Sequence, residues 1–320
     1  MGLEIHNLPE RGNTSVRTQP AQMCSVIVPT YNRPEQLGVC LRALARQTYP
    51  RHLTEVIVVD DGSDEPPETV IASMQDALDV TLLSQENAGP ASARNSGAGK
   101  ARGDLLAFTD DDCLPERDWL DKLVDTAERN EGCLIGGRTV NRLEDNPYAS
   151  AHQLFMGFLY TYYNTNPTRS IFFTSNNMAC PTDVFRELQG FDNAYPLAGG
   201  EDRAFCDHWL KQGHRMVYTP DAVVSHAHVL TGRTFWRHHF NYGRGAYRFR
   251  RQVARQDRKT LSFEATSFYL KLILAPYSRK DCPAGLRCRS FLVFLMFISQ
   301  IANASGFFME MVAPTEKIRR

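Results

Sequence analysis

Three consecutive carboxylates, Asp110, Asp111 and Asp112, directly follow the apolar run Leu105–Thr109. Adjacent carboxylates repel one another, and a bound cation offsets much of that repulsion. Their hard oxygen atoms favour Mg²⁺ or Mn²⁺ over zinc. The triplet therefore predicts a divalent metal site. A surface turn of aspartates that caps the following helix is the alternative interpretation.

Two further groups carry side chains that suit such a site. Glu201 and Asp202 follow a pair of glycines and begin a segment with helical spacing, Glu201–Gln212. A carboxylate there can accept a proton from a reacting hydroxyl, although an acidic pair at a helix start also fits the helix dipole. His226 and His228 follow a strand-like run and would share one face of an extended chain. Either histidine could complete a metal site, and the sequence does not decide between them.

Strands and helices alternate through the first third of the chain. The spacing predicts strands at Ser25–Val28, Glu55–Val59, Val80–Ser84 and Leu105–Thr109, and helices at Glu35–Gln47, Glu68–Ala77 and Ala91–Ala101. This alternation predicts a parallel, doubly wound α/β sheet. In such sheets the ligand lies beyond the carboxyl ends of the strands, which is where the acidic clusters fall.

Five segments together carry a resemblance to a known family. They read VIVPTYNRPEQL (Val26–Leu37), VIVVDDGSD (Val56–Asp64), NAGPASARNSGAGKARG (Asn87–Gly103), LLAFTDDDCLPERDWL (Leu105–Leu120) and GGED (Gly199–Asp202). In this order and spacing they resemble the nucleotide-diphosphate-sugar transferases of glycosyltransferase family 2, and the resemblance covers about residues 23–230. It implies a GT-A fold with a mixed, mostly parallel sheet, a nucleotide-sugar-binding half at 23–135 and an acceptor-binding half at 136–230. The composition adds a disordered lead at 1–22 and a basic, then apolar, helical region at 231–320.

The resemblance implies a donor site at the ends of the first strands. The residues implied are Pro29, Thr30, Tyr31, Asp60, Asp61, Arg94 and Asp111. Tyr31 is expected to stack on the base, and one carboxylate of the Asp60–Asp61 pair is expected to accept a hydrogen bond from it. Arg94 is expected near the diphosphate. Asp111 is expected to turn toward the ribose or a neighbouring side chain.

The resemblance also assigns the metal and the base. Asp110 and Asp112 match the DxD metal site of the family, which implies that Mg²⁺ or Mn²⁺ bridges the donor phosphates. His226 is the implied third ligand, with His228 left open. Asp202 matches the general base, and inverting transfer needs only this one carboxylate. The residues expected to border the acceptor are Asn176, Asn177 and Glu201.

Other nucleotide-binding signatures are absent from the sequence. No GxGxxG follows the first strand, and Gly99-Lys100 lacks the spacing of a P-loop. A nucleotidylyltransferase, the second enzymatic interpretation, would need a Gly-rich basic signature that PTYNRPEQL does not supply. A non-catalytic scaffold that binds sugar nucleotides would not need the intact acidic residues. The Gln-x-x-Arg-Trp motif of processive members is replaced by TFWRHH at Thr234–His239, so a single transfer is expected.

The formal net charge of the chain is zero, but the charge is unevenly distributed. Eight Arg and one Lys lie between Thr231 and Thr260 against a single Asp, and the uncharged run Phe291–Met309 follows. A basic block beside an apolar segment suits an anionic membrane surface as well as a solvated helix face. Polar residues interrupt the uncharged run, which favours a buried or interfacial helix over a membrane span.

Cysteine spacing and the first residues indicate the compartment. The eight cysteines lack CxxC spacing, and residues 1–22 lack an apolar run, which together predict buried thiols and a cytoplasmic location. We therefore expect a metal-dependent, hexosyltransferase-like enzyme, peripheral at the cytoplasmic face of a membrane. Its expected donor is a nucleotide-diphosphate sugar, and its expected acceptor is a glycan or a lipid-linked molecule in surface polysaccharide or glycolipid synthesis. No nucleic-acid partner is expected.

Overall fold

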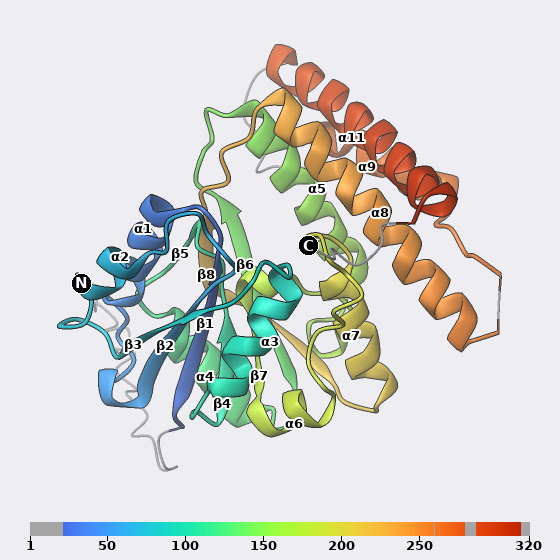
Figure 1. Cartoon of the computed structure of the whole chain (residues 1–320). Coiled ribbons are helices and arrows are strands. Elements are labelled where there is room, and N and C mark those ends of the chain that lie inside the picture. The colour runs from blue at the N-terminus through green and yellow to red at the C-terminus, as the bar shows by residue number, and fades with distance from the viewer. Residues whose placement is uncertain (1–21, 259, 279–285, 315–320) are drawn as a thin grey trace, which may run out of the picture.

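The computed structural model describes residues 22–258, 260–278 and 286–314 and arranges them around one eight-stranded sheet (Figure 1). The strand order is β3-β2-β1-β4-β7-β6-β8-β5. The strands are β1 (Cys24–Thr30), β2 (Thr54–Asp60), β3 (Val80–Ser84), β4 (Leu105–Phe108), β5 (Cys113–Pro115), β6 (Leu134–Asn141), β7 (Met178–Pro181) and β8 (Met216–His226). Almost all of the predicted lead at 1–22 lies outside the described residues, as does Cys282.

The sheet is parallel in its first half and mixed in its second. β3, β2, β1 and β4 run parallel, β7 pairs antiparallel with both β4 and β6, and β8 pairs parallel with β6 and antiparallel with β5. The predicted mixed, mostly parallel sheet is therefore confirmed. The predicted boundary between residues 135 and 136 falls inside β6, so both predicted halves contribute strands to one sheet.

The central strands are buried on both faces because successive side chains point to opposite sides of a strand. In β1, Val26 and Val28 belong to one core cluster and Ile27 belongs to another. The first cluster is covered by α1 (Pro34–Leu44), α2 (Glu68–Ala72) and α4 (Trp119–Arg129). The second is covered by α3 (Pro90–Lys100), α6 (Thr182–Glu187) and α7 (Glu201–Lys211).

The remaining helices form a third core beside the sheet. They are α5 (Pro147–Tyr163), α8 (Gly232–Gln256), α9 (Thr266–Ile273), α10 (Ala275–Ser278) and α11 (Leu286–Val312), and short 3₁₀ turns lie at Arg51–Leu53, Pro167–Arg169 and Ser175–Asn177. Leu154 of α5, Phe235 of α8, Leu272 of α9 and Met296 of α11 meet in this core. The predicted C-terminal helical region is thus present and packs against α5.

α8 and α11 lie side by side in close contact (Figure 1). A Cβ on Gly243 would overlap the backbone of Asn303, and a Cβ on Gly306 would overlap the backbone of Phe240. The buried Glu310 carboxylate also accepts hydrogen bonds of 2.7 Å from the Nε atoms of Arg244 and Arg248. Glycine contacts and buried ion pairs therefore fix α11 to α8.

Candidate active site

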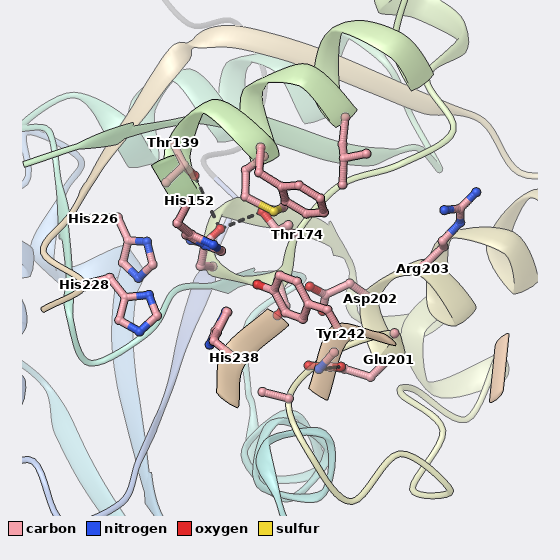
Figure 2. A pocket seen from close by; sticks show the side chains of 18 of the residues that line it. Thr139, His152, Thr174, Glu201, Asp202, Arg203, His226, His228, His238 and Tyr242 are labelled. Carbon is pink, nitrogen blue, oxygen red and sulfur yellow. Dashed lines mark hydrogen bonds between the residues drawn. The ribbon is translucent and has the colours of Figure 1, made fainter. Parts of the chain in front are cut away.

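A cavity of about 1650 Å³ lies between the carboxyl ends of the strands and helices α5, α7 and α8. It is larger than the 300–1,000 Å³ (roughly) that holds a typical small ligand. Figure 2 shows its wall, with Glu201 and Asp202 on one side and His226 and His228 on another. All three aspartates of the Asp110–Asp112 triplet also line it. The cavity thus joins residues from distant parts of the chain.

Asp110 and Asp111 have different partners. Asp110 Oδ1 accepts a 2.7 Å hydrogen bond from Nη2 of Arg94, which is buried on α3. Asp111 accepts from Thr30 Oγ1 at 2.8 Å and from Arg33 Nη1 at 3.2 Å. Burial, with repulsion from the next carboxylate, raises the pKa of Asp111 to about 7. Asp111 is therefore turned toward neighbouring side chains, which is one of its two predicted orientations.

Asp112 and His226 are in direct contact. Asp112 Oδ1 lies 3.1 Å from His226 Nε2. The contact follows from strand pairing, because Cys113 of β5 is in register with His226 of β8 and the Ala227 amide donates to the Asp112 carbonyl at 2.9 Å. Burial alone would raise the pKa of Asp112, but His226 and Arg33 together hold it below its usual range. Asp112 is therefore an ionised carboxylate in contact with the His226 imidazole.

These groups fit a divalent cation by their chemistry. Ligand atoms of Asp112, Cys113 and His226 lie within 4.8 Å of one another. Burial raises the pKa of the Cys113 thiol well above its usual value, so the thiol stays protonated and is a poor ligand. Carboxylate and imidazole remain, a donor pair that accepts Mn²⁺. Arg33 Nη1, 3.1 Å from Asp112 Oδ2, supplies positive charge at the same carboxylate.

The glycine pair before Asp202 sets the position of α7. Gly200 has φ +96°, and a Cβ there would lie 2.9 Å from the backbone of Gly245 on α8. Among the described residues, Asp202 Oδ1 is buried without a hydrogen-bond partner. Burial raises the pKa of Asp202, against the opposing effects of Arg94 and of hydrogen bonds from Ser175. A buried carboxylate with an unused oxygen facing a cavity suits proton acceptance.

Glu201 points differently from its neighbour. Its Oε2 accepts a 2.6 Å hydrogen bond from the Gly199 amide, and its Oε1 lies 3.8 Å from Arg94 Nη1. Burial, together with repulsion from Asp202, raises the pKa of Glu201 to about 8. Glu201 lines the cavity, but these contacts support its own loop and the Arg94 side chain. Its predicted acceptor contact stays a prediction.

Most of the predicted nucleoside-binding residues line the cavity. Pro29 and Thr30 end β1, and Tyr31 follows with 46% of its surface exposed. Asp61 also lines the cavity and accepts hydrogen bonds of 2.9 Å from the amides of Ala88 and Gly89. Asp61 therefore holds the loop before α3 while it faces the cavity.

Asp60 does not line this cavity, and its predicted donor contact stays a prediction. Its side chain is buried, and its Oδ1 accepts from the amide and hydroxyl of Ser63 at 3.2 and 2.5 Å. The carboxylate closes the turn at the end of β2. This is the capping role that an Asp-Asp-Gly-Ser turn commonly has.

Of the two neighbouring asparagines, Asn176 lines the cavity and Asn177 does not. Asn176 lines the cavity and accepts a 2.7 Å hydrogen bond from Thr174 Oγ1. Asn177 is fully buried, accepts from Trp119 Nε1 at 2.8 Å, and donates to the carbonyls of Arg138 and Ala222 at 3.0 Å. Asn177 does not line the cavity, and its predicted acceptor contact stays a prediction. Its amide is occupied in joining α4, β6 and β8.

Sequence reasoning missed several residues of the cavity wall. Arg33 was visible only as part of the PTYNRP turn, with no sign that it would bridge Asp111 and Asp112. His152 on α5 and His238 on α8 are far apart in the sequence, and no local spacing connects them. Burial lowers the pKa of both histidines well below the usual value. Only the fold brings these residues together.

Residues 25–189 match the family described as Glycosyl transferase family 2. Among curated proteins, the glycosyltransferase AglE of Haloferax volcanii is 28% identical over 215 residues, which cover 65% of this chain and 68% of AglE. The pre-mycofactocin glycosyltransferase of Mycobacterium tuberculosis is 32% identical over 210 residues, 64% of this chain. The match spans 42% of the length of that relative.

Solved structures share the fold at low sequence identity. The mannosyltransferase PcManGT from Pyrobaculum calidifontis, in complex with GDP-Man and Mn²⁺, has a TM-score of 0.57 and 20% identity, covering 93% of this chain and 77% of that one. TarS 1-349 of S. aureus, in complex with UDP-GlcNAc, has a TM-score of 0.52 and 14% identity, covering 91% and 92%. These likenesses agree with the fold of the sheet, and residues 25–189, which match the family, span more than half of the sequence. The chain belongs to glycosyltransferase family 2 and has its GT-A fold.

Proposed function

We propose that the protein transfers a single glycosyl unit from a nucleotide-diphosphate sugar to an acceptor hydroxyl, with inversion at the anomeric carbon. The observation that carries the proposal is one cavity with the Asp112–His226 pair on one wall and the Asp202 carboxylate on another. A metal-binding pair and a single carboxylate with one unpartnered oxygen, in the same cavity, are the minimum that inverting transfer requires. PcManGT, bound to GDP-Man and Mn²⁺, supports the donor class and the metal.

The donor would lie along the ends of β1 and β4. Tyr31 and Asp61 are available to the nucleoside because both face the cavity next to the first strand. Arg94 is buried between Asp110 and Glu201, and its Nε makes no hydrogen bond to the described residues. It therefore offers a fixed positive charge to a diphosphate. Asp110, Asp112 and His226 would hold Mg²⁺ or Mn²⁺.

The proposed transfer needs only one base to account for every bond and proton. The acceptor oxygen forms a bond to the anomeric carbon as the bond from that carbon to the donor phosphate oxygen breaks. The acceptor proton passes to the Asp202 carboxylate, and the nucleoside diphosphate leaves with the bonding electron pair. The divalent cation, when bound, neutralises charge on the departing diphosphate. Attack on the face opposite the leaving group inverts the anomeric centre.

The far end of the cavity supports a lipid-linked acceptor. Phe268 and Leu272 of α9 and Phe307 and Phe308 of α11 line it there. An apolar wall favours hydrocarbon over a hydroxyl-rich glycan, because sugar hydroxyls would lose hydrogen bonds to water without replacement. We therefore propose that the acceptor carries an apolar chain and that the enzyme serves glycolipid or surface polysaccharide synthesis.

We propose that α11 lies in the membrane interface and does not cross the bilayer. Between Arg287 and Val312, α11 is long and apolar enough to cross a membrane by length and composition, with 39% of its most apolar window buried. Its contacts with α8 and the buried ion pairs of Glu310 favour a helix held on the protein. A peripheral position at the cytoplasmic face would bring the apolar end of the cavity to the lipid.

The metal assignment is tested by donor binding. Asp112→Asn and Asp110→Asn should each abolish the Mn²⁺-dependent part of nucleoside diphosphate binding in isothermal titration calorimetry. Both variants should keep the wild-type circular dichroism spectrum, because strand-end carboxylates contribute little to the core.

Asp76→Asn changes an exposed aspartate after α2. It is the matched control and should bind as the wild type does. Full Mn²⁺ dependence in both Asp110 and Asp112 variants would overturn the assignment. Donor binding without any turnover in the wild type would instead favour a sugar-nucleotide-binding scaffold.

A further inference from the structure

A cluster of three histidines lies beside the Asp112–His226 pair and takes no part in the proposed transfer. His152 comes from α5, His228 follows β8, and His238 comes from α8 (Figure 2). Their ring centroids are 5.6 Å apart for His152–His228, 4.9 Å for His152–His238 and 4.9 Å for His228–His238. One ring nitrogen of each lies within 4.8 Å of a ring nitrogen of the other two. Three separate elements therefore bring imidazoles to one point.

Each of these rings also carries a buried nitrogen without a partner. Among the described residues, His152 Nδ1, His228 Nδ1 and His238 Nε2 are buried and make no hydrogen bond. Buried polar atoms are nearly always paired, because an unpaired one loses its hydrogen bonds to water without replacement. His152 is only 5% exposed, so water does not reach most of its ring. Three such nitrogens on converging rings indicate a shared ligand.

We propose that His152, His228 and His238 bind a borderline-soft divalent cation, with Zn²⁺ as its representative, at a site separate from the carboxylate site. Imidazole nitrogens suit Zn²⁺, Cu²⁺ and Ni²⁺, whereas Mg²⁺ prefers oxygen. Three histidines with one open position are a common ligand set for zinc. All three rings line the cavity, so the fourth coordination position faces it.

The neighbouring His226 separates the two sites. Its Nε2 is 3.1 Å from Asp112 Oδ1, and its ring centroid is 5.1 Å from that of His228. His226 therefore belongs with the carboxylates, while His228 groups with His152 and His238. The two sites are adjacent but share no side chain. The carboxylate site offers oxygen and imidazole nitrogen, and the three-histidine site offers imidazole nitrogen alone.

A cation at the three histidines would connect the helical region to the sheet. α5 and α8 supply one ligand each, and the segment that leaves β8 supplies the third. Metal binding would then oppose separation of α8 from the strand that carries His226. We expect Zn²⁺ to raise the melting temperature of the full chain in the presence of saturating Mg²⁺, which fills the carboxylate site.

The test uses Co²⁺ as a spectroscopic substitute for Zn²⁺. The full chain, stripped by chelator and returned to excess Mg²⁺, should bind one Co²⁺ with the visible absorption of nitrogen coordination. Stoichiometric Zn²⁺ should remove that absorption. His152→Gln, His228→Gln and His238→Gln should each weaken Co²⁺ binding at least about 100-fold, because even supporting residues of metal sites cost about 10–100-fold. His228→Cys should retain binding and add a thiolate-to-cobalt charge-transfer band.

The controls separate this site from the carboxylate site and from misfolding. His52→Gln, an exposed histidine after α1, should leave the Co²⁺ absorption unchanged. Asp112→Asn should keep the absorption while losing Mn²⁺-dependent nucleotide binding. His228 lies in a loop, so its variants test the site even if changes within α5 or α8 disturb folding. Absence of the absorption in the wild type, its persistence in the His228→Gln variant, or its loss in Asp112→Asn would each overturn the proposal.

Discussion

At the scale of single residues, Asp112 is held from two sides. His226 contacts one oxygen at 3.1 Å, and Arg33 contacts the other at 3.1 Å while also reaching Asp111 at 3.2 Å. Arg33 thus offsets the repulsion within the carboxylate triplet, and a divalent cation at Asp112 would supply the same charge. Arg33 and the cation are therefore expected to compete for one carboxylate.

Arg33→Gln should make the protein less stable without metal and more responsive to metal. Removing the guanidinium leaves the triplet uncompensated, which should cost about 1 kcal/mol for a half-exposed ion pair. Mn²⁺ without nucleotide should then raise the melting temperature of the variant more than that of the wild type. Arg129→Gln removes an exposed pair with Asp125 on α4 and serves as the control. An equal Mn²⁺ response in Arg33→Gln and wild type would show that Arg33 does not share the carboxylate with metal.

Asp202→Asn should separate catalysis from donor binding. Loss of a general base costs about 100-fold or more in turnover, and Asp202 lines the cavity with one oxygen that has no hydrogen-bond partner among the described residues. We expect kcat to fall by at least about 100-fold while the Kd for the nucleoside diphosphate changes little. Steady-state kinetics and calorimetry on the same preparation measure both. Unchanged turnover, or an equal loss of donor affinity, would exclude Asp202 as the base.

The candidate site could be predicted only where its residues belong to recognisable local patterns. The carboxylates Asp110–Asp112, the Glu201-Asp202 pair and His226 all follow strands or begin helices, and each lines the cavity. Asn177 and Asp60 belong to equally polar patterns, but a local hydrogen bond from Ser63 occupies Asp60 and hydrogen bonds to distant strands occupy Asn177. A sequence pattern does not distinguish a side chain that serves a turn from one that faces a ligand.

At the scale of elements, the approach of α7 to α8 positions the proposed base. Gly199 and Gly200 directly precede α7 with positive φ, and the Gly245 backbone packs directly on them. A side chain at any of these positions would push the two helices apart. The first turn of α7 would then move, and the Asp202 carboxylate with it. The glycine pair therefore determines where the proposed base lies.

Gly200→Ala should lower both stability and activity, whereas Gly213→Ala should lower stability alone. Both glycines flank α7 and have positive φ, +96° and +88°, so alanine costs each about 1–2 kcal/mol. A Cβ at Gly200 also meets Gly245 at 2.9 Å, while a Cβ at Gly213 has open space. The overlap should cost a further 1–3 kcal/mol (roughly) and displace Asp202. Denaturant unfolding measures the loss of stability, and kcat measures the displacement of Asp202. Equal kcat in both variants would contradict the role of Gly200 in positioning Asp202.

The alternating elements of the first third were predictable from hydrophobic spacing, and β5 was not. The predicted strands and helices of the first 110 residues correspond to β1–β4 and α1–α3, although α2 ends at Ala72 and not at Ala77. β5 is three residues long, which is too short for any periodicity to appear. Yet β5 determines the site, because its pairing with β8 brings His226 to Asp112.

At the scale of the whole molecule, the sheet and the helical region share one cavity. Strand ends contribute the carboxylates, and α9 and α11 contribute the apolar wall. α11 continues that apolar character to the outside, where Phe291, Phe294, Phe297 and Ile301 are 40–54% exposed. Their spacing of three or four residues places them on one face of the helix. An apolar outer face beside an apolar cavity end is what access to a lipid-linked acceptor would need.

The basic block contributes less than its composition suggests. Of its eight arginines, Arg244 and Arg248 pair with Glu310, and Arg250 donates to the Ser262 carbonyl. Lys259 lies outside the described residues. The exposed members are Arg233, Arg237, Arg251, Arg255 and Arg258. Each exposed cation near an anionic leaflet contributes about 1 kcal/mol, so electrostatics supports docking but the phenylalanine face of α11 should dominate it.

Phe294→Glu combined with Phe297→Glu should therefore abolish membrane docking while leaving the fold intact. The wild-type chain should sediment with anionic liposomes, and salt should weaken binding only in part, because the apolar contribution is insensitive to screening. Each half-exposed phenylalanine contributes about 1 kcal/mol on insertion, and the two new charges oppose insertion further. Bound fraction at limiting lipid should fall at least about 10-fold.

Val39→Glu places the same charge at an exposed apolar site on α1 and should sediment as the wild type does. Point variants are preferable to truncation because removing α11 would uncover the third core and create apolar surface of its own. If the double variant sediments like the wild type, the α11 face does not contact the bilayer, and the apolar cavity wall would then have to receive an acceptor from solution.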